Sequence, residues 1–340
     1  MTLTGNKRNM RISVDAMGGD FAPAEIVRGS VEAARKGGVE LILVGPEDIV
    51  KAELSKHNTD SLPIQIIHAS QYLVEGEHPA VAIRQKRNAS IVVATKLVRD
   101  GKADAVVGAG PTGGVVACAL TFLGCVAGLS RPVVGGTFIG LNKKMIALDL
   151  GGNIDCRPDQ MLDFAIAGTI YAKKCLHVEN PRVGLLTIGA EEGKGNAQNL
   201  AAFPLFRKSN LNFIGNVEGL DLLSGRADVI VCDGFVGNIL VKFTEAMGYA
   251  TASWLEKRLS GKITDDELKA LTAEYIAMTN AAETLGGGPL LGVNGVAMVA
   301  HGRCKALEIT RAIQQARDIV ETGLVENLKT ELEKAHQAIG

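Results

Sequence analysis

The sequence predicts an α/β fold in which a mainly parallel sheet is covered by helices on both faces. Short runs rich in Val and Ile alternate along the chain with segments whose apolar residues recur at helical spacing, which is typical of a parallel sheet. Hydrophobic residues make up 46% of the 340 residues, and this proportion with forty glycines fits a compact enzyme with a large core. Polar, glycine-rich segments follow the strands, so we expect them to meet at the carboxyl edge of the sheet, where such folds bind ligands.

The first part of the chain supplies three strands and three helices of this pattern. The predicted strands are 11–15, 41–44 and 64–67, and the predicted helices are 24–36, 47–57 and 78–100. The third helix carries five cations, which are Arg84, Lys86, Arg87, Lys96 and Arg99. Such a helix is most often a solvated surface, and a docking face for an acidic partner is the alternative interpretation.

Residues 225–238, GRADVIVCDGFVGN, combine a buried strand at 227–232, a turn at Asp233-Gly234 and the start of a helix at Gly237-Asn238. Residues 101–114 repeat this pattern, with matches at Gly101, Ala103, Asp104, Val107, Gly110 and Gly113. A strand, a glycine-rich turn and a helix start place backbone N–H groups at the sheet edge, where they bind anions. The repetition supports the fold more strongly than it supports a function.

The remaining elements continue the alternation. The further predicted strands are 133–139, 144–150, 183–188, 212–214 and 293–300, and the further helices are 115–129 and 159–175. Residues 304–337 are predicted to be mostly helix. Pro204 lies in another helical stretch, which we expect it to kink or end. Residues 105–130 carry no charge, but their helical part, 115–129, is shorter than the roughly 20 residues that a membrane span needs. A buried helix is therefore predicted there.

Two long helices at 239–259 and 265–284 form a predicted hairpin. Thr264 and Glu267 have the spacing of a capping box at the start of the second helix, and Gly286-Gly287-Gly288-Pro289 ends it. We expect 1–9 to be a disordered extension and 10–337 to be a single α/β catalytic domain that includes the hairpin at 239–285. Core or dimer packing explains most apolar residues of the hairpin, and binding of the basic tip to anionic lipid is the less common alternative.

Composition and missing motifs exclude several function classes. A net charge of −1 and an aromatic content of 4% disfavour a nucleic-acid surface. The six cysteines form no CxxC pair, which with the absence of a signal peptide indicates reduced thiols in a cytoplasmic protein. Glu75, Glu77 and His78 fit a loop before a helix better than a metal site. GxxxxGK[ST] does not occur, and the GxGxxG fingerprint is missing after the first strand, where MGGD stands instead, so nucleotide binding is weakly supported. We expect no metal and no cofactor.

Several polar side chains follow strands and are predicted to gather at one edge of the sheet. These are Asp15, Thr112, Asn153, Lys194, Asp233, Asn238 and His301. The segment Gly193-Lys194-Gly195-Asn196 combines a flexible backbone, a cation and an amide, which suits an oxyanion such as phosphate. The spacing leaves an exposed loop lysine as an equal alternative for Lys194, and a histidine bonded to backbone is the ordinary interpretation of His301.

Several long motifs occur in a fixed order from residue 14 to residue 302. They read VDAMGGDFAP, LDLGGNIDCRP, VGLLTIGAEEGKGN, FIGNVEG, ADVIVCDGFVGN, GGGPLLGVNGV and HG. With these motifs the chain resembles the PlsX phosphate acyltransferases, which transfer an acyl chain from acyl carrier protein to inorganic phosphate. The resemblance covers the chain after Met10 and implies a Rossmann-like, doubly wound fold similar to phosphotransacetylases and isocitrate dehydrogenases, with a protruding helical hairpin.

The resemblance further implies a homodimeric cytoplasmic enzyme that associates peripherally with the anionic membrane surface. Such an enzyme passes acyl phosphate to a membrane glycerol-3-phosphate acyltransferase for phospholipid synthesis. The chain departs from the family at three places, where it has Pro111 in a GNTGA-like segment, Phe21 after MGGD, and Arg303-Cys304 in an HGSS-like segment.

The residues suit direct attack of phosphate on a thioester, because this step needs orientation, charge neutralisation and donors for the oxyanion rather than a strong base. We assign Lys194 to the phosphate or oxyanion, Asn238 to a further donor, and Asp233 to orienting Lys194 or a water. The expected substrate-binding residues are Asp15, Gly18, Gly110, Thr112, Gly113, Asn153, Glu192, Asn196, Gly237 and His301. The alternatives are a short-chain phosphotransacetylase, an NAD-dependent dehydrogenase of related fold, and a non-catalytic protein that binds carrier protein or a lipid surface.

Overall fold

The computed structural model describes residues 9–140 and 144–339, without the side chains of 335–339. The chain forms two compact units. Unit 1 contains Met1–Ala127 and Leu285–Lys329, and unit 2 contains Gly128–Thr284 and Thr330–Gly340. The predicted disordered extension lies outside the described residues except for Asn9, and the single catalytic domain over 10–337 stays a prediction.

Unit 1 is built on a sheet with the strand order β3-β2-β1-β4-β11-β10. Its strands are β1 (Met10–Asp15), β2 (Val39–Gly45), β3 (Ile64–His68), β4 (Ala105–Gly108), β10 (Gly288–Leu291) and β11 (Val296–Val299). All neighbours are parallel except β10 and β11. Ile12 of β1 pairs with Leu41 and Ala105 and is fully buried, as expected for a parallel sheet with helices on both faces.

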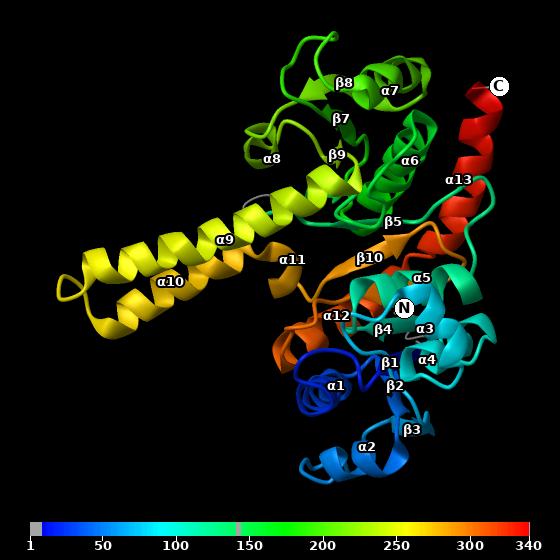
Figure 1. Cartoon of the computed structure of the whole chain (residues 1–340), viewed down its shortest axis with the longest axis vertical. Helices are drawn as coiled ribbons and strands as arrows, with labels where there is room; N and C mark the ends of the chain where they lie inside the picture. Colours follow the sequence, from blue (N-terminus) through cyan, green and yellow to red (C-terminus); the bar gives the residue numbers. More distant parts are fainter. Residues whose placement is uncertain (1–8, 141–143, 340) are drawn as a thin grey trace, which may run out of the picture. The chain divides into compact units, whose positions relative to one another are not determined.

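Six helices of unit 1 flank this sheet (Figure 1). They are α1 (Ala24–Lys36), α2 (Glu47–Leu54), α3 (Pro79–Gln85), α4 (Ser90–Arg99), α5 (Thr112–Phe122) and α12 (Ala306–Glu321). Helix α1 packs closely on α12, since a Cβ on Gly29 would meet the side chain of Ile309 at 2.7 Å. The Thr310 hydroxyl donates to the Gly29 carbonyl at 2.9 Å across the same contact.

The long helix predicted at 78–100 is wrong, because a turn at 86–89 separates α3 from α4. Ala89 forms a parallel bridge with Gln71. The Ser90 N–H donates to the Gln71 carbonyl at 2.8 Å, and the Gln71 N–H donates to the Asn88 carbonyl at 3.3 Å. Hydrogen bonds to a distant segment thus replace those that would have continued the helix.

Unit 2 has a second sheet, with the strand order β5-β6-β9-β7-β8. The strands are β5 (Val133–Gly136), β6 (Ile146–Leu148), β7 (Arg182–Leu186), β8 (Asn212–Val217) and β9 (Val229–Val231). All neighbours are parallel except β5 and β6. With α6 (Pro158–Cys175), α7 (Ala197–Lys208) and α8 (Asp221–Ser224), unit 2 confirms the predicted α/β fold with a mostly parallel sheet.

Helix α7 continues through Pro204 to Lys208, so this proline does not end the helix, and the alternative of a kink stays a prediction. Pro204 lies on an exposed part of the helix. Its missing N–H leaves the carbonyl of Leu200 without an intrahelical donor, and Leu200 is also exposed. Water can therefore satisfy this carbonyl, which lowers the cost of a proline inside the helix.

The hairpin of unit 2 consists of α9 (Gly234–Leu259) and α10 (Asp265–Thr279), followed by α11 (Ala281–Thr284). Figure 1 shows α9 and α10 side by side, extending from the rest of unit 2. The predicted capping box is confirmed, since Thr264 Oγ1 accepts from the Glu267 N–H and Glu267 Oε2 accepts from the Thr264 N–H. Helix α9 begins five residues earlier than the predicted 239, because Asp233 caps it.

At the C-terminal end of the chain, the predicted strand and helical segment are present, but the predicted boundaries of the strand are wrong. The strand predicted at 293–300 is shorter as β11, and the preceding strand β10 occupies part of a segment that was predicted only to end a helix. Residues 304–337 are mostly helix, as predicted, and they form α12 and α13 (Leu324–Ile339). Gly323 has a φ of 64°, which lies in the left-handed region and ends α12.

Two further expectations concern thiols and membranes. All six cysteines are described, and each carries a thiol rather than a disulfide. No helix among the described residues is both long and apolar enough to pass through a bilayer.

Candidate active site

The loops after three adjacent strands of unit 1 contact one another at the carboxyl edge of the sheet. The Asp20 N–H, after β1, donates to the carbonyl of Gly302, after β11, at 2.7 Å. A Cβ on Gly18 would lie 2.7 Å from the Gly110 nitrogen, which follows β4. The structure therefore brings the loops of Asp15, Gly18, Gly110 and His301 together as expected, and the roles of these residues stay predictions.

Asp15 is the buried carboxylate of this edge. Its Oδ1 accepts from the Met17 N–H at 3.1 Å. Burial raises the pKa of Asp15 to about 6, against a smaller lowering by the neighbouring Ser90 hydroxyl and by the Met17 and Gly18 N–H groups. The Ser90 Oγ is buried without a well-formed hydrogen bond, so its effect on Asp15 is one of proximity. Glycine is required at 18, because a Cβ would also lie 2.7 Å from Asp15 Oδ2.

Helix α5 begins at this edge with two predicted substrate contacts, Thr112 and Gly113. Pro111 occupies the N-cap position, where no side chain caps the helix. The Gly114 and Val115 N–H groups both bond to the Pro111 carbonyl. The first N–H groups of a helix have no acceptor within it, so the exposed start of α5 presents donors to an anion. Pro111 removes one donor and leaves those that follow it.

A second cluster forms in unit 2 around the buried carboxylate of Asp149, just after β6. Its Oδ1 accepts from the Gly151 N–H at 3.0 Å and from the Gly152 N–H at 2.8 Å. Its Oδ2 accepts from the backbone N–H and from the side-chain amide of Asn153, each at 2.7 Å. Burial raises the pKa of Asp149, and these four hydrogen bonds oppose that rise. The carboxylate thereby fixes the loop that carries Asn153.

The start of α9 packs directly against this loop. The Asp233 carboxylate caps α9 by accepting from the Val236 N–H at 2.8 Å, and the Gly234 N–H donates to the Asn153 carbonyl at 2.8 Å. Gly237 lies so close to the Asp149 carbonyl that no side chain fits there. The side chain of Asn238 lies beside Gly151. Asn153, Asp233, Gly237 and Asn238 are thus neighbours.

Asp149, Gly151 and Gly152 were not among the predicted site residues, although LDLGGN was recognised as a motif. The available signal was an acidic residue at the end of an apolar strand, followed by two glycines. Glycines let the chain turn back so that successive N–H groups reach one carboxylate. A charged residue at the end of a buried strand needs such donors, because burial without them is costly.

The loop between β7 and α7 carries the other predicted residues of unit 2. Lys194 is exposed. Glu192 forms an ion pair with Arg207 at 2.8 Å, and Asn196 caps α7 by accepting from the Asn199 N–H at 2.9 Å. Among the described side chains, no hydrogen bond or ion pair joins Lys194 to Asp233. The predicted orientation of Lys194 by Asp233 is therefore not a contact of this structure and stays a prediction for a substrate-bound state.

Two thiols lie near the Asp149 cluster and are held in their neutral form. Cys232 Sγ donates to the Asp149 carbonyl at 3.5 Å, and Cys156 Sγ donates to the Asn153 carbonyl at 3.4 Å. Burial raises the pKa of Cys156 to about 11 and that of Cys232 well above its usual value. A thiol acts as a nucleophile only as thiolate, so neither cysteine is suited to covalent catalysis at neutral pH.

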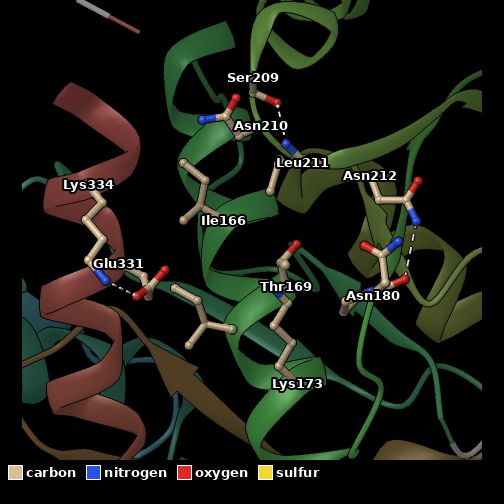
Figure 2. A pocket seen from close by; sticks show the side chains of 12 residues that line it. Ile166, Thr169, Lys173, Asn180, Ser209, Asn210, Leu211, Asn212, Glu331 and Lys334 are labelled. Atoms are coloured by element: carbon tan, nitrogen blue, oxygen red, sulfur yellow. Dashed lines mark hydrogen bonds and ion pairs between the residues drawn. The ribbon is translucent and has the colours of Figure 1, made fainter. Parts of the chain in front are cut away.

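A cavity of about 320 Å³ in unit 2 lies away from this chemistry (Figure 2). Its walls come from α6, from α13, and from the segments that precede β7 and β8. Ile166 and Leu211 line it together with Asn180 and Asn212, which are joined by a hydrogen bond from Asn212 Nδ2 to the Asn180 carbonyl. Because Asn180 and Asn212 lie at the amino ends of these strands, the cavity is at the sheet edge opposite to Asp149.

Comparison with protein families identifies relatives over nearly the whole chain. Residues 10–327 match the family described as "Fatty acid synthesis protein". A phosphate acyltransferase from Pelotomaculum thermopropionicum is 44% identical over 333 residues, which cover 95% of each chain. A phosphate acyltransferase from Desulforamulus reducens is 42% identical over 327 residues, which cover 95% of this chain and 98% of the relative.

Solved structures of related fold support the architecture. A phosphotransacetylase from Streptococcus pyogenes aligns with a TM-score of 0.60 and 18% identity, covering 92% of this chain and 94% of that one. The EutD phosphotransacetylase from Staphylococcus aureus aligns with a TM-score of 0.57 and 17% identity, covering 93% and 95% of the two chains. At these identities the similarity establishes the fold alone.

The raised pKa of Asp15 predicts that this carboxyl group lowers the stability of the fold as the pH rises. It ionises at 3.8 when unperturbed and at about 6 in the folded chain. Between these values the folded state binds more protons than the unfolded state, so the free energy of unfolding decreases with increasing pH. The loss is at most about 3 kcal/mol, at roughly 1.36 kcal/mol per pKa unit.

Asp15→Asn keeps an acceptor for the Met17 N–H and cannot ionise. We therefore expect the unfolding temperature of the variant, relative to wild type, to be higher at about pH 7 than at about pH 4. Thermal unfolding at both pH values tests this, and Ser90→Ala, which removes a group that lowers the pKa, should enlarge the pH dependence. An identical pH dependence in wild type and Asp15→Asn would contradict the assignment.

Proposed function

Because this chain belongs to the PlsX family of phosphate acyltransferases, we propose that it transfers a fatty acyl chain from acyl carrier protein to inorganic phosphate. The product, an acyl phosphate, then serves phospholipid synthesis. The observation that carries this proposal is the identity of 42–44% to phosphate acyltransferases over nearly the full chain. The family membership makes the chain an enzyme of acyl transfer to phosphate, and the carrier-protein donor and the metabolic role are the proposed parts.

The reaction needs little general acid–base catalysis. Phosphate is an anionic nucleophile at neutral pH, and the leaving thiolate has a conjugate acid with a pKa of roughly 8.5. One phosphate oxygen attacks the thioester carbonyl, the C–S bond breaks when the tetrahedral intermediate collapses, and the thiolate takes a proton from water. The protein has to neutralise the charge of phosphate, orient it and donate hydrogen bonds to the oxyanion. Buried thiols of high pKa are consistent with direct attack.

We assign the phosphate to Lys194, whose exposed ammonium stands on a glycine-flanked loop after β7. Asn238 supplies an amide donor from the first turns of α9, and its position depends on the Asp149 cluster. Asp233 acts through the helix cap that holds α9 beside the Asn153 loop. In these roles one exposed cation acts together with polar groups that are held in place by hydrogen bonds and close packing, as catalysis by preorganisation requires.

The residues of unit 1 are proposed to contact substrate mainly through backbone. The start of α5 at Thr112 and Gly113 offers N–H groups, and the tight approach of Gly18 to Gly110 keeps side chains out of the edge. His301 lies in the loop after β11 and is proposed as a secondary polar contact. Glu192 and Asn196 shape the Lys194 loop, because both are engaged in contacts with α7.

We further propose a homodimer that uses the hairpin. Along α9 the apolar residues Phe235, Ile239, Phe243 and Met247 recur every four residues and are exposed, Phe243 by 62%. This spacing puts them on one stripe of the helix, and an uncovered apolar stripe is typical of a helix that pairs with a partner. The packing of α10 on α9 leaves this stripe free.

The hairpin tip is proposed to attach the enzyme peripherally to anionic membranes from the cytoplasm. Lys257, Arg258 and Lys262 lie at or near the turn between α9 and α10, and Trp254 is exposed one turn before them. Cations and an exposed tryptophan together favour the surface of an anionic bilayer. Acyl phosphate would then be released next to a membrane glycerol-3-phosphate acyltransferase that consumes it.

The defining experiment measures free thiol released from a long-chain acyl carrier protein, with acyl phosphate trapped by hydroxylamine. We expect release that requires phosphate and yields trapped product in equal amount. Release of free thiol without phosphate would contradict the proposed acyl transfer to phosphate. Release from short-chain acyl coenzyme A alone would favour the phosphotransacetylase alternative instead.

Lys194→Ala should lower kcat/KM for phosphate by roughly 10- to 100-fold, because a hydrogen bond to a charged group contributes about 1.5–3 kcal/mol. Lys194→Arg retains the charge and should recover part of the loss. Lys208→Ala, which changes another exposed lysine of unit 2, is the matched control and should leave kcat/KM unchanged. Normal turnover by Lys194→Ala would remove Lys194 from the site.

Phe243→Asp should convert the proposed dimer into a monomer, because it places a charge in the middle of the apolar stripe. Light scattering coupled to size-exclusion chromatography measures the mass. Leu271→Asp, an equally drastic change of an exposed apolar residue on α10, is the control and should leave the dimer intact. A monomeric wild type, or a dimeric Phe243→Asp variant, would show that the stripe is not the interface.

Reversal of the tip charges tests the membrane proposal. Lys257→Glu combined with Lys262→Glu should abolish flotation of the protein with vesicles that contain anionic lipid, and added salt should weaken the flotation of wild type. Turnover of a soluble donor should be unaffected, since the tip carries no substrate contact. Equal flotation of wild type and the double variant would exclude attachment through the tip.

A further inference from the structure

A basic groove lies on the surface of unit 1 between α3, α4 and α5. Its volume is about 540 Å³. The lining residues are Ala80, Ile83, Arg84, Arg87, Lys96, Ala117, Leu120, Thr121 and Phe122. None of the three charged residues in this lining is acidic. We call this surface the α3–α5 groove.

Two of the cations in the groove, Arg84 and Arg87, form no ion pair with the side chains that the structure describes. The other basic residues of the segment are neutralised, because Lys86 pairs with Glu77 at 2.6 Å and Arg99 pairs with Asp100 at 2.7 Å. Arg84 and Arg87 are exposed, and their guanidinium groups have no hydrogen bond or ion pair with any side chain that the structure describes. Unpaired arginines are well suited to bind carboxylates, since the guanidinium presents donors in a fixed fork.

Lys96 and the apolar residues at the bottom of the groove complete its lining. Lys96 Nζ lies 5.0 Å from the centroid of the Phe122 ring and donates to the Arg87 carbonyl at 3.3 Å. Ile83 is buried below the groove, while Leu120 and Phe122 are partly exposed along it. An apolar floor between cations matches a helix that carries carboxylates on both sides of an apolar residue.

We propose that the α3–α5 groove binds an acidic amphipathic helix of the protein that delivers the acyl group. This proposal rests on the proposed function for the identity of that protein, an acyl carrier protein, and adds where it docks. Carboxylates of the helix pair with Arg84 and Arg87, and an apolar side chain packs on Leu120 and Phe122. The long cationic segment is thus a docking face rather than only a solvated surface.

The position of the groove suits delivery of a tethered substrate. Helix α5 starts at Thr112 and Gly113, which are predicted substrate contacts, and it lines the groove from Ala117 to Phe122, with Leu120 at the middle of this stretch. Eight residues of helix separate Thr112 from Leu120, which is roughly 12 Å at 1.5 Å per residue. A carrier that docks on the groove therefore holds its thioester arm within reach of the start of α5, while its folded body stays outside.

A protein helix explains the groove better than a nucleic acid does. A nucleic-acid surface combines many cations with aromatic platforms, and the chain has a net charge of −1 with 4% aromatic residues. Two arginines and one lysine over an apolar floor fit a short acidic patch. Such a contact contributes specificity and association rate, and salt should weaken it.

Binding and turnover of the double variant Arg84→Glu/Arg87→Glu test the proposal. Fluorescence anisotropy with labelled holo acyl carrier protein measures binding without any chemistry. We expect the dissociation constant to rise at least about tenfold relative to wild type, since the variant opposes carboxylates with carboxylates. Turnover with acyl carrier protein should show a matching rise in KM, while turnover with uncharged acyl-pantetheine should stay within about twofold, because this donor does not use the groove.

The matched control is Lys36→Glu/Lys102→Glu, which makes the same change of net charge at two exposed lysines of unit 1 outside the groove. It should bind and turn over like wild type. Equal binding of carrier protein by wild type and the Arg84/Arg87 variant would overturn the proposal, as would an equal loss with both donors, which would indicate a structural defect. Carrier binding that depends on the arginines without phosphate-dependent turnover would support the groove and contradict the proposed function.

Discussion

The carboxylate of Asp149 is the constraint on which the arrangement of unit 2 depends. It is fully buried at the end of β6 and accepts four hydrogen bonds from Gly151, Gly152 and Asn153. A buried acid is costly unless it is satisfied in this way, so the loop has to turn tightly around it. The same residue presents its backbone carbonyl to Gly237, which brings α9 close enough for Gly234 to bond to Asn153. This contact positions the hairpin and the polar residues at its base.

Unit 1 also contains a buried carboxylate at the end of a strand, that of Asp15. Both acids follow a buried strand and precede a glycine pair, in DAMGG and DLGG, and both have a pKa raised by burial. They are satisfied differently, because Asp149 collects four donors while Asp15 relies on fewer and sits beside a Ser90 hydroxyl. Carboxylates at strand ends thus organise loops, and in the proposed site the groups assigned to the anion are the N–H groups and the cation of those loops.

The surfaces of the two units differ in the partners that they suit. The stripe on α9 is apolar and regular, which favours a copy of the same helix, whereas the α3–α5 groove is concave and basic, which favours an acidic protein. The cations at the hairpin tip project from the end of a long helix pair and suit a flat anionic surface. A net charge near zero thus conceals local patches of different character, and each proposed partner is chosen to match one of these patches rather than the total charge.

The sequence by itself determined the α/β class, the order of most elements, the capping box at Thr264 and the family, because hydrophobic period, turn chemistry and long motifs are local signals. Only the tertiary structure decided where contacts between distant segments override local preference. The bridge from Ala89 to Gln71 splits the predicted helix at 78–100, and the exposed position of Leu200 and Pro204 lets α7 run through the proline. The same reason explains the missed Asp149: its role is defined by N–H groups that the folded loop turns toward it, and by Gly237, which lies far along the chain.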